Sequence, residues 1–135
     1  MVTSETHQQN FERLECWQPC RELRLFVVKK VLPVLPPEER FRLSDQALRA
    51  GRSTAANIAE GDGRYNYLDN AKFCRNARGS CKEVLDHLIT ANDEGLISDE
   101  LLLEGRFLVE RAVMLLSAYI RYLNRAKADD SSRGE

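Results

Sequence analysis

The sequence predicts an all-α protein, an antiparallel up-down-up-down four-helix bundle, and three observations support this prediction. Apolar residues recur at steps of three and four along four long segments, which is the period of one helix face. The 135 residues include only seven Gly and four Pro, and so few breakers favour long helices over many short strands. Apolar and charged residues make up 43% and 30% of the chain, as in a globular single domain of this length.

The first helix is predicted from about Trp17 to Leu32, after a flexible polar lead over residues 1–12. Pro19 falls in the first turn, where its missing N–H would have no helical partner. The residues that we expect to face inward follow at helical spacing: Cys16, Cys20, Leu23, Phe26, Val27 and Val31. Prolines at 33, 36 and 37 end this helix.

The second helix is predicted to begin after Leu43, with Ser44 as its N-cap, and to end at Gly61 and Gly63. Its inward residues are mostly Ala and Gly. Side chains this small allow the backbone of a neighbouring helix to approach closely.

The third helix, from about Leu68 to Glu94, has the most regular apolar pattern in the chain. Its inward residues are Cys74, Ala77, Cys81, Val84, Leu88 and Ala91. They alternate steps of three and four, as in a heptad seam. Gly95 stands where a helix C′ residue belongs.

The fourth helix is predicted from about Asp99 to Arg125, with Ser98 as its cap, and the bundle as a whole spans residues 13–126. A polar tail, 127–135, follows. Two apolar stripes run side by side along this helix: Leu101, Gly105, Leu108, Ala112, Leu115, Tyr119 and Tyr122, then Leu102, Val109, Val113, Leu116, Ile120 and Leu123. A face that wide indicates either a generous core or an interface between subunits.

Charge is unevenly distributed, although the net charge is only −1. From Phe41 to Lys82 eight basic residues stand against four acidic ones, a net +4, whereas Glu83 to Glu135 carries six basic and eleven acidic residues, a net −5. No apolar run is long enough to span a bilayer, and the N-terminus lacks a secretory signal. We therefore expect a cytoplasmic protein with reduced cysteines.

The sequence contains little that supports a catalytic site or a metal site. His7 lies in the polar lead, and His87 on the third helix has no nucleophile at a suitable spacing, so we expect no enzyme. The four cysteines fall in apolar stripes without the loop spacing of zinc sites, so we expect core packing and no cofactor. Gly61-Asp62-Gly63 resembles part of a phosphate-binding loop. That motif requires a strand before it and Gly-Lys-Ser/Thr after it, and the sequence has neither.

A basic flank of the second and third helices is the candidate nucleic-acid site. Its residues are Arg49, Arg52, Arg64, Tyr65, Tyr67, Lys72, Arg75, Arg78 and Lys82. Arginines that bind phosphates beside aromatic rings that stack on bases form sequence-tolerant RNA or DNA surfaces. The alternative is a solvated flank that the acidic fourth helix of the same or a neighbouring subunit balances.

Several strings in the second and third helices resemble a known family. They are Glu39-Arg40-Phe41-Arg42-Leu43-Ser44, Ser53-Thr54-Ala55-Ala56-Asn57-Ile58-Ala59-Glu60-Gly61 and Asn76-Ala77-Arg78-Gly79-Ser80. Together with Trp17 and residues 95–97, they are similar to the signature of four-helix-bundle proteins encoded in bacterial 23S rRNA intervening sequences.

The resemblance implies a homopentamer in which Asn57, Glu60 and Gly61 are structural motif residues. Hydrogen bonds of Asn57 and Glu60 would hold the second helix in register. A more distant similarity, to the accessory protein of diversity-generating retroelements, implies a pentamer that binds nucleic acid and a reverse transcriptase. The chain is therefore expected to be a non-enzymatic homo-oligomer that binds RNA or DNA, or else a protein adaptor that docks a larger enzyme.

Overall fold

The computed structural model describes residues 10–134, and side chains up to residue 131. Its elements are η1 (Phe11–Arg13), α2 (Trp17–Phe26), η2 (Val27–Val31), η3 (Leu32–Val34), η4 (Pro37–Glu39), α3 (Leu43–Asp62), α4 (Tyr67–Asp93) and α5 (Asp99–Gly134). No strand occurs in this range. The prediction of an all-α fold with four principal helices is confirmed.

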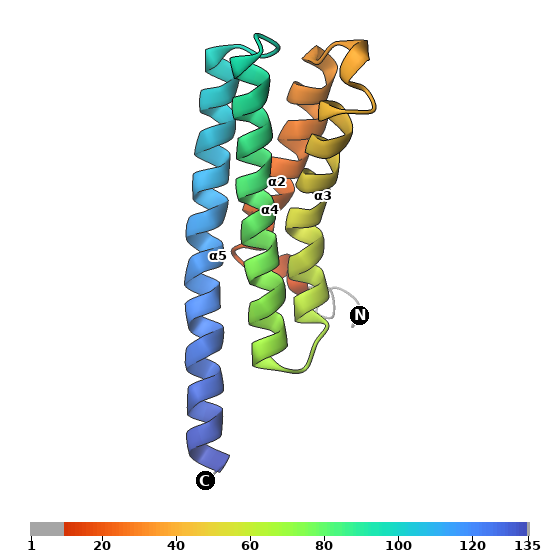
Figure 1. Cartoon of the computed structure of the whole chain (residues 1–135). Helices are drawn as coiled ribbons and strands as arrows, with labels where there is room; N and C mark the ends of the chain where they lie inside the picture. The colour runs from red at the N-terminus through yellow and green to blue at the C-terminus, as the bar shows by residue number, and fades with distance from the viewer. Residues whose placement is uncertain (1–9, 135) are drawn as a thin grey trace, which may run out of the picture.

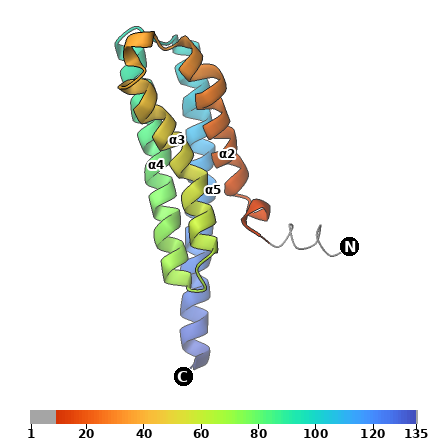
Figure 2. The same ribbon diagram turned by 90° about the vertical axis from the view of Figure 1, so that its right-hand side faces the viewer.

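The four principal helices lie side by side along one axis (Figures 1 and 2). Helix α4 packs between α3 and α5, and α2 packs against α3 and α5. The α3–α4 loop lies at one end, and the α2–α3 and α4–α5 connections lie at the other (Figure 1). This arrangement is compatible with the up-down-up-down order. No helix in the described part of the chain is both long and apolar enough to cross a membrane.

The first helix is shorter than the predicted Trp17–Leu32 because it changes type after Phe26. The N–H of Leu32 bonds to the carbonyl of Val27, five residues back, which makes η2 a π-helical turn. Pro33 has no N–H to continue an α-helical ladder, and its ring would clash with the carbonyl four residues earlier. The helix therefore has a wider, π-helical turn before the proline and a narrower 3-10 turn, η3, at the proline itself.

The predicted helix ends are partly confirmed. Ser44 as an N-cap was wrong, because α3 already begins at Leu43, whose N–H bonds to the Glu39 carboxylate at 3.3 Å. The Ser98 cap is confirmed by its hydroxyl, which accepts the Leu101 N–H at 3.1 Å. Gly95 has a φ of +73°, the left-handed C′ conformation that favours glycine.

Helix α5 extends to Gly134, beyond the predicted end at Arg125. Residues 126–131 contain neither Gly nor Pro and include two alanines and a lysine, so helix propensity suffices to continue it. The last turns project past the α3–α4 loop (Figures 1 and 2). Much of the predicted polar tail, 127–135, is thus helical, whereas most of the predicted lead, 1–12, lies outside the described residues.

The predicted core residues of the first and third helices are all buried. On α5 every residue of the two predicted apolar stripes is buried or half-buried except Tyr122. A generous core therefore accommodates most of the wide apolar face. Gly105 is part of it, because an added Cβ would contact Leu88 and lie 3.0 Å from the Phe26 ring.

Candidate nucleic-acid interface

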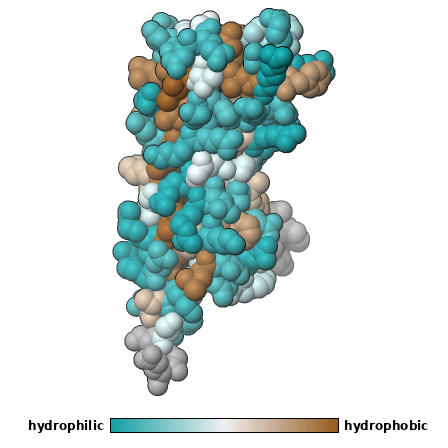
Figure 3. Space-filling view, viewed as in Figure 1, coloured by the Kyte–Doolittle hydropathy of each residue, from teal (hydrophilic) through white to brown (hydrophobic). Residues whose placement is uncertain are grey.

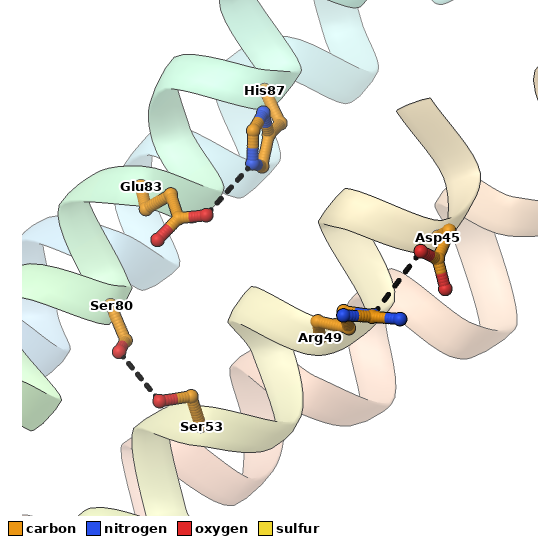
Figure 4. Close-up of polar contacts among 6 residues, drawn as sticks. All are labelled: Asp45, Arg49, Ser53, Ser80, Glu83 and His87. Atoms are coloured by element: carbon orange, nitrogen blue, oxygen red, sulfur yellow. Dashed lines mark hydrogen bonds and ion pairs between the residues drawn. The ribbon is translucent and has the colours of Figure 1, made fainter. Parts of the chain in front are cut away.

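The α3–α4 hairpin brings the family motif against α4. A Cβ on Gly61 would lie 2.6 Å from Asn70 Oδ1 and 2.9 Å from Phe73 Cβ, so only glycine allows the two helices to approach this closely. Farther along the pair, the hydroxyls of Ser53 and Ser80 share a hydrogen bond of 2.8 Å (Figure 4). Helices α3 and α4 are thus held together at two positions along their length, at Gly61 and at Ser53.

Asn57 supports the second of these contacts. Its amide donates to both the carbonyl and the hydroxyl of Ser53, at 2.8 and 2.9 Å, and so orients the hydroxyl that reaches Ser80. Glu60 instead pairs with Arg64 on the exposed side of the same helix end, at 2.9 Å. Asn57 and Glu60, together with Gly61, therefore act on the structure of the hairpin.

Arg78 marks the side of α4 that faces α5, because its guanidinium donates to the hydroxyl of Ser117 at 3.1 Å. Arg75 precedes it by three residues and Lys82 follows it by four, so both lie on the same face of the helix. Lys72 precedes Arg75 by a further three residues and extends the row. All except the half-buried Arg78 are exposed.

Sequence reasoning missed one further cation on this side. Arg121 is exposed and follows Ser117 by four residues, on the same face of α5. Because α5 runs opposite to α4 (Figure 1), Arg121 lies toward the end of α4 that carries Lys72 and Arg75. Only packing shows this proximity, since Arg121 follows Arg75 by 46 positions in the sequence. We call Lys72, Arg75, Arg78, Lys82 and Arg121 the α4–α5 basic face.

The remaining predicted residues lie elsewhere. Arg49 lies one turn before Ser53, toward the α3–α4 side, and pairs with Asp45 at 3.2 Å (Figure 4). Arg52 is exposed and follows Leu48 by four residues, on the side that Leu48 shares with the connection from α2 to α3. The arginines of α3 therefore do not join the row on α4.

The predicted aromatic residues lie in the α3–α4 loop and at the first position of α4. Tyr65 is fully exposed and Tyr67 is 41% exposed. The Arg64 guanidinium lies 4.9 Å from the centre of the Phe73 ring and also pairs with Glu60. Its charge is therefore largely satisfied, whereas the two tyrosine rings are free to stack.

Ion pairs with carboxylates distinguish Arg49 and Arg64 from the cations of the α4–α5 basic face. Arg49 and Arg64 each bind a carboxylate of their own helix end. In residues 10–131, none of the cations of the α4–α5 basic face forms an ion pair. The surface formed by α3, α4 and α5 is largely hydrophilic (Figure 3). This row of unpaired cations is therefore a candidate anion-binding feature of the described surface.

Three buried thiols, those of Cys16, Cys20 and Cys74, are held in their neutral forms. Burial raises the pKa of Cys16 and of Cys74 to about 12. The hydrogen bond with Cys81, at 3.9 Å between sulfurs, together with burial raises the pKa of Cys20. Thiols in this state are poor nucleophiles. No group of three or more metal-ligating side chains is found in the described residues.

His87 has a carboxylate partner but no nucleophile. Its Nε2 lies 3.2 Å from Glu83, one turn earlier on α4 (Figure 4). One surface hollow, of about 470 Å³, is lined mainly by apolar side chains of residues 32–48, and its single carboxylate, Asp45, is held by Arg49.

The fold defines the class: a small all-α protein with four principal helices. The family model for 23S rRNA-intervening sequence proteins matches residues 12–128, and the chain belongs to that family. The family resemblance of the sequence strings is thereby confirmed. A comparison with curated proteins finds no match.

Proposed function

We propose that this protein is a non-enzymatic homo-oligomer that binds RNA through the α4–α5 basic face. The observation that carries the proposal is the row of cations without carboxylate partners. A row of exposed cations that form no ion pair attracts a polyanion. Three of the five are arginines, whose planar guanidinium suits two-pronged contacts with phosphate.

The loop between α3 and α4 complements this face. It lies at the end of the bundle near Lys72, where Tyr65 of the loop and Tyr67 at the start of α4 have exposed rings. Bases of a single strand whose backbone lies along α4 could stack on these rings. The family is named for an intervening sequence of 23S rRNA, so RNA is the first ligand to test.

The assembly of copies rests on a stripe of α5 that sequence reasoning missed. Leu103, Phe107 and Met114 are 67%, 64% and 62% exposed, and spacings of four and seven place them on one line of the helix, opposite its buried residues. A row of large exposed apolar side chains is typical of an interface. We propose that this stripe joins copies, with the pentamer as the expected number. Several basic faces in one particle would then bind one RNA with avidity.

The same stripe supports a second candidate function. It could dock another protein, and the particle would then be an adaptor for a larger enzyme such as a reverse transcriptase. The similarity to the retroelement accessory protein stays a prediction. We also propose a cytoplasmic location, because the four cysteines are free and buried, as expected in a reducing compartment.

Binding of a labelled RNA tests the proposal. The probe is a mixed-sequence single strand of about 20 nucleotides, longer than most single-strand site sizes, and fluorescence anisotropy follows binding from about 50 to 200 mM salt. Four to five phosphate contacts predict a slope of about −3 for the logarithm of affinity against that of salt. No binding at the lowest salt would contradict the proposal, and adaptor contacts with an apolar centre would show little salt dependence.

A further inference from the structure

Gly79 lies near the middle of α4, at an exposed position where a methyl side chain would contact no other residue. A Cβ built on this residue would meet no atom within 4 Å. The residue belongs to a 27-residue helix, far from either end. Neither a turn nor a close internal contact therefore explains the glycine.

Glycine at such a position destabilises a helix, because it adds backbone freedom to the unfolded chain and has no side chain to cover the backbone. Two other helical glycines, which pack tightly, differ from it. Gly61 faces Asn70 and Phe73, and Gly105 faces Leu88 and Phe26. The fold requires small residues at those two positions, whereas at position 79 alanine would fit and would stabilise the helix.

The surroundings of Gly79 point to an anionic ligand. On the helix surface its neighbours are Arg75 four residues before, Asn76 three before, Lys82 three after and Glu83 four after. Glu83 is engaged by His87 at 3.2 Å. Arg75 and Lys82 have no ion-pair partner in the described chain, and Asn76 is exposed with donors to offer. The gap left by the missing side chain is thus bordered by two unpaired cations, an amide and the Glu83 carboxylate, which His87 contacts.

We infer that Gly79 is the point at which the phosphate backbone of a bound nucleic acid comes into van der Waals contact with the backbone of α4. This inference rests on the proposed function and adds a site to it. Without a Cβ, the strand can lie against the helix between Arg75 and Lys82, so that both side chains reach phosphates on either side. A methyl group at position 79 lifts the strand and lengthens these contacts.

The test is Gly79→Ala in the full chain, with two measurements. Thermal unfolding should show a Tm about 3 °C higher, since alanine removes the cost of a helical glycine. Anisotropy with the same single-stranded RNA should show binding roughly tenfold weaker, the effect of one or two weakened contacts. A variant that is more stable yet binds less tightly cannot owe its defect to unfolding.

Ala56→Ser is the matched control, since it adds one atom to an exposed residue of α3 and should leave RNA affinity unchanged. Equal affinity of Gly79→Ala and the natural protein would overturn the inference but leave the proposed function intact, whereas a natural protein that binds no RNA overturns both. A lower Tm would show that the fold itself needs this glycine. A change in sedimentation would assign Gly79 to contacts between copies. Either result overturns the inference.

Discussion

Gly61 of α3 lies so close to Asn70 of α4 that an alanine Cβ would stand 2.6 Å from the amide oxygen. The same Asn70 donates to the Tyr119 hydroxyl at 3.3 Å and accepts from the Cys74 thiol at 3.5 Å. One glycine thus allows a polar side chain to link α3, α4 and α5 where the loop joins the hairpin.

We predict that Gly61→Ala lowers the free energy of unfolding by about 2–3 kcal/mol, because a methyl group forced into this contact must displace Asn70 or the helix. Urea denaturation followed by circular dichroism measures it. The matched variant is Gly79→Ala, which should change stability in the opposite direction. Equal effects at the two positions would contradict the packing described for Gly61.

The hydrogen bonds of Asn57 predict a second stability effect. Asn57→Ala leaves Ser53 free to rotate away from Ser80, and we expect a loss of about 1 kcal/mol for these part-buried bonds. Glu60→Ala removes only an exposed pair with Arg64 and should cost less than about 0.5 kcal/mol. Urea denaturation of both variants checks this order, and a larger effect at Glu60 would reverse the assigned roles.

Stability should fall at alkaline pH. The pKa of Cys16 and of Cys74 rises from 9.0 to about 12, mainly by burial, and burial likewise raises the pKa of Tyr119 from 10.0 to about 12. Above pH 9 the unfolded chain loses these protons while the folded chain retains them. The free energy of unfolding therefore decreases as pH rises from about 9 toward 12.

Urea denaturation at several pH values measures this decrease. In Cys74→Ala the decrease should be shallower between pH 9 and 10, because one group that ionises only on unfolding is missing. An identical slope in the variant would mean that the Cys74 thiol is not protected in the folded protein.

The outer stripe of α5 predicts the behaviour of the assembly. Phe107→Asp places a charge among Leu103 and Met114 and should dissociate the particle, since an unpaired charge in an apolar interface is costly. Sedimentation velocity measures the change. Val34→Asp is the control, because Val34 is an exposed apolar residue, at 53%, on a different part of the bundle. A particle that Phe107→Asp leaves intact would remove the stripe from the interface.

Periodicity in the sequence predicted the helices and their buried faces well. The seam from Cys74 to Ala91 alternates so regularly that only one face of α4 could turn inward. Local side-chain chemistry was harder to predict. Ser44 has the residue type of an N-cap, but Glu39, which the preceding turn places nearby, satisfies the first N–H of α3. The π-helical turn before Pro33 was likewise not predicted, because it depends on how the backbone adjusts to the N–H that proline lacks.

The candidate site was predicted only in part, because the rotation of each helix about its axis depends on its neighbours. Arg52 and Arg78 both belong to a basic segment, yet Arg78 contacts α5 and Arg52 lies on the side of α3 away from α4. Arg121 joins the row on α4 through packing alone. Pairing with carboxylates, which separates Arg49 from Arg75, also requires three-dimensional contacts.

Charge reversal on the two sets of cations tests the central claim most directly. Arg75→Glu/Lys82→Glu changes the α4–α5 basic face, and Arg49→Glu/Arg64→Glu changes the net charge equally at cations that carboxylates already hold. Both variants are compared with the natural protein for affinity to the labelled single-stranded RNA at about 100 mM salt, where phosphate contacts still contribute strongly. We predict a loss of at least about a hundredfold for the first variant and less than about fivefold for the second. Equal losses would show a response to net charge alone and would contradict a binding site on this face.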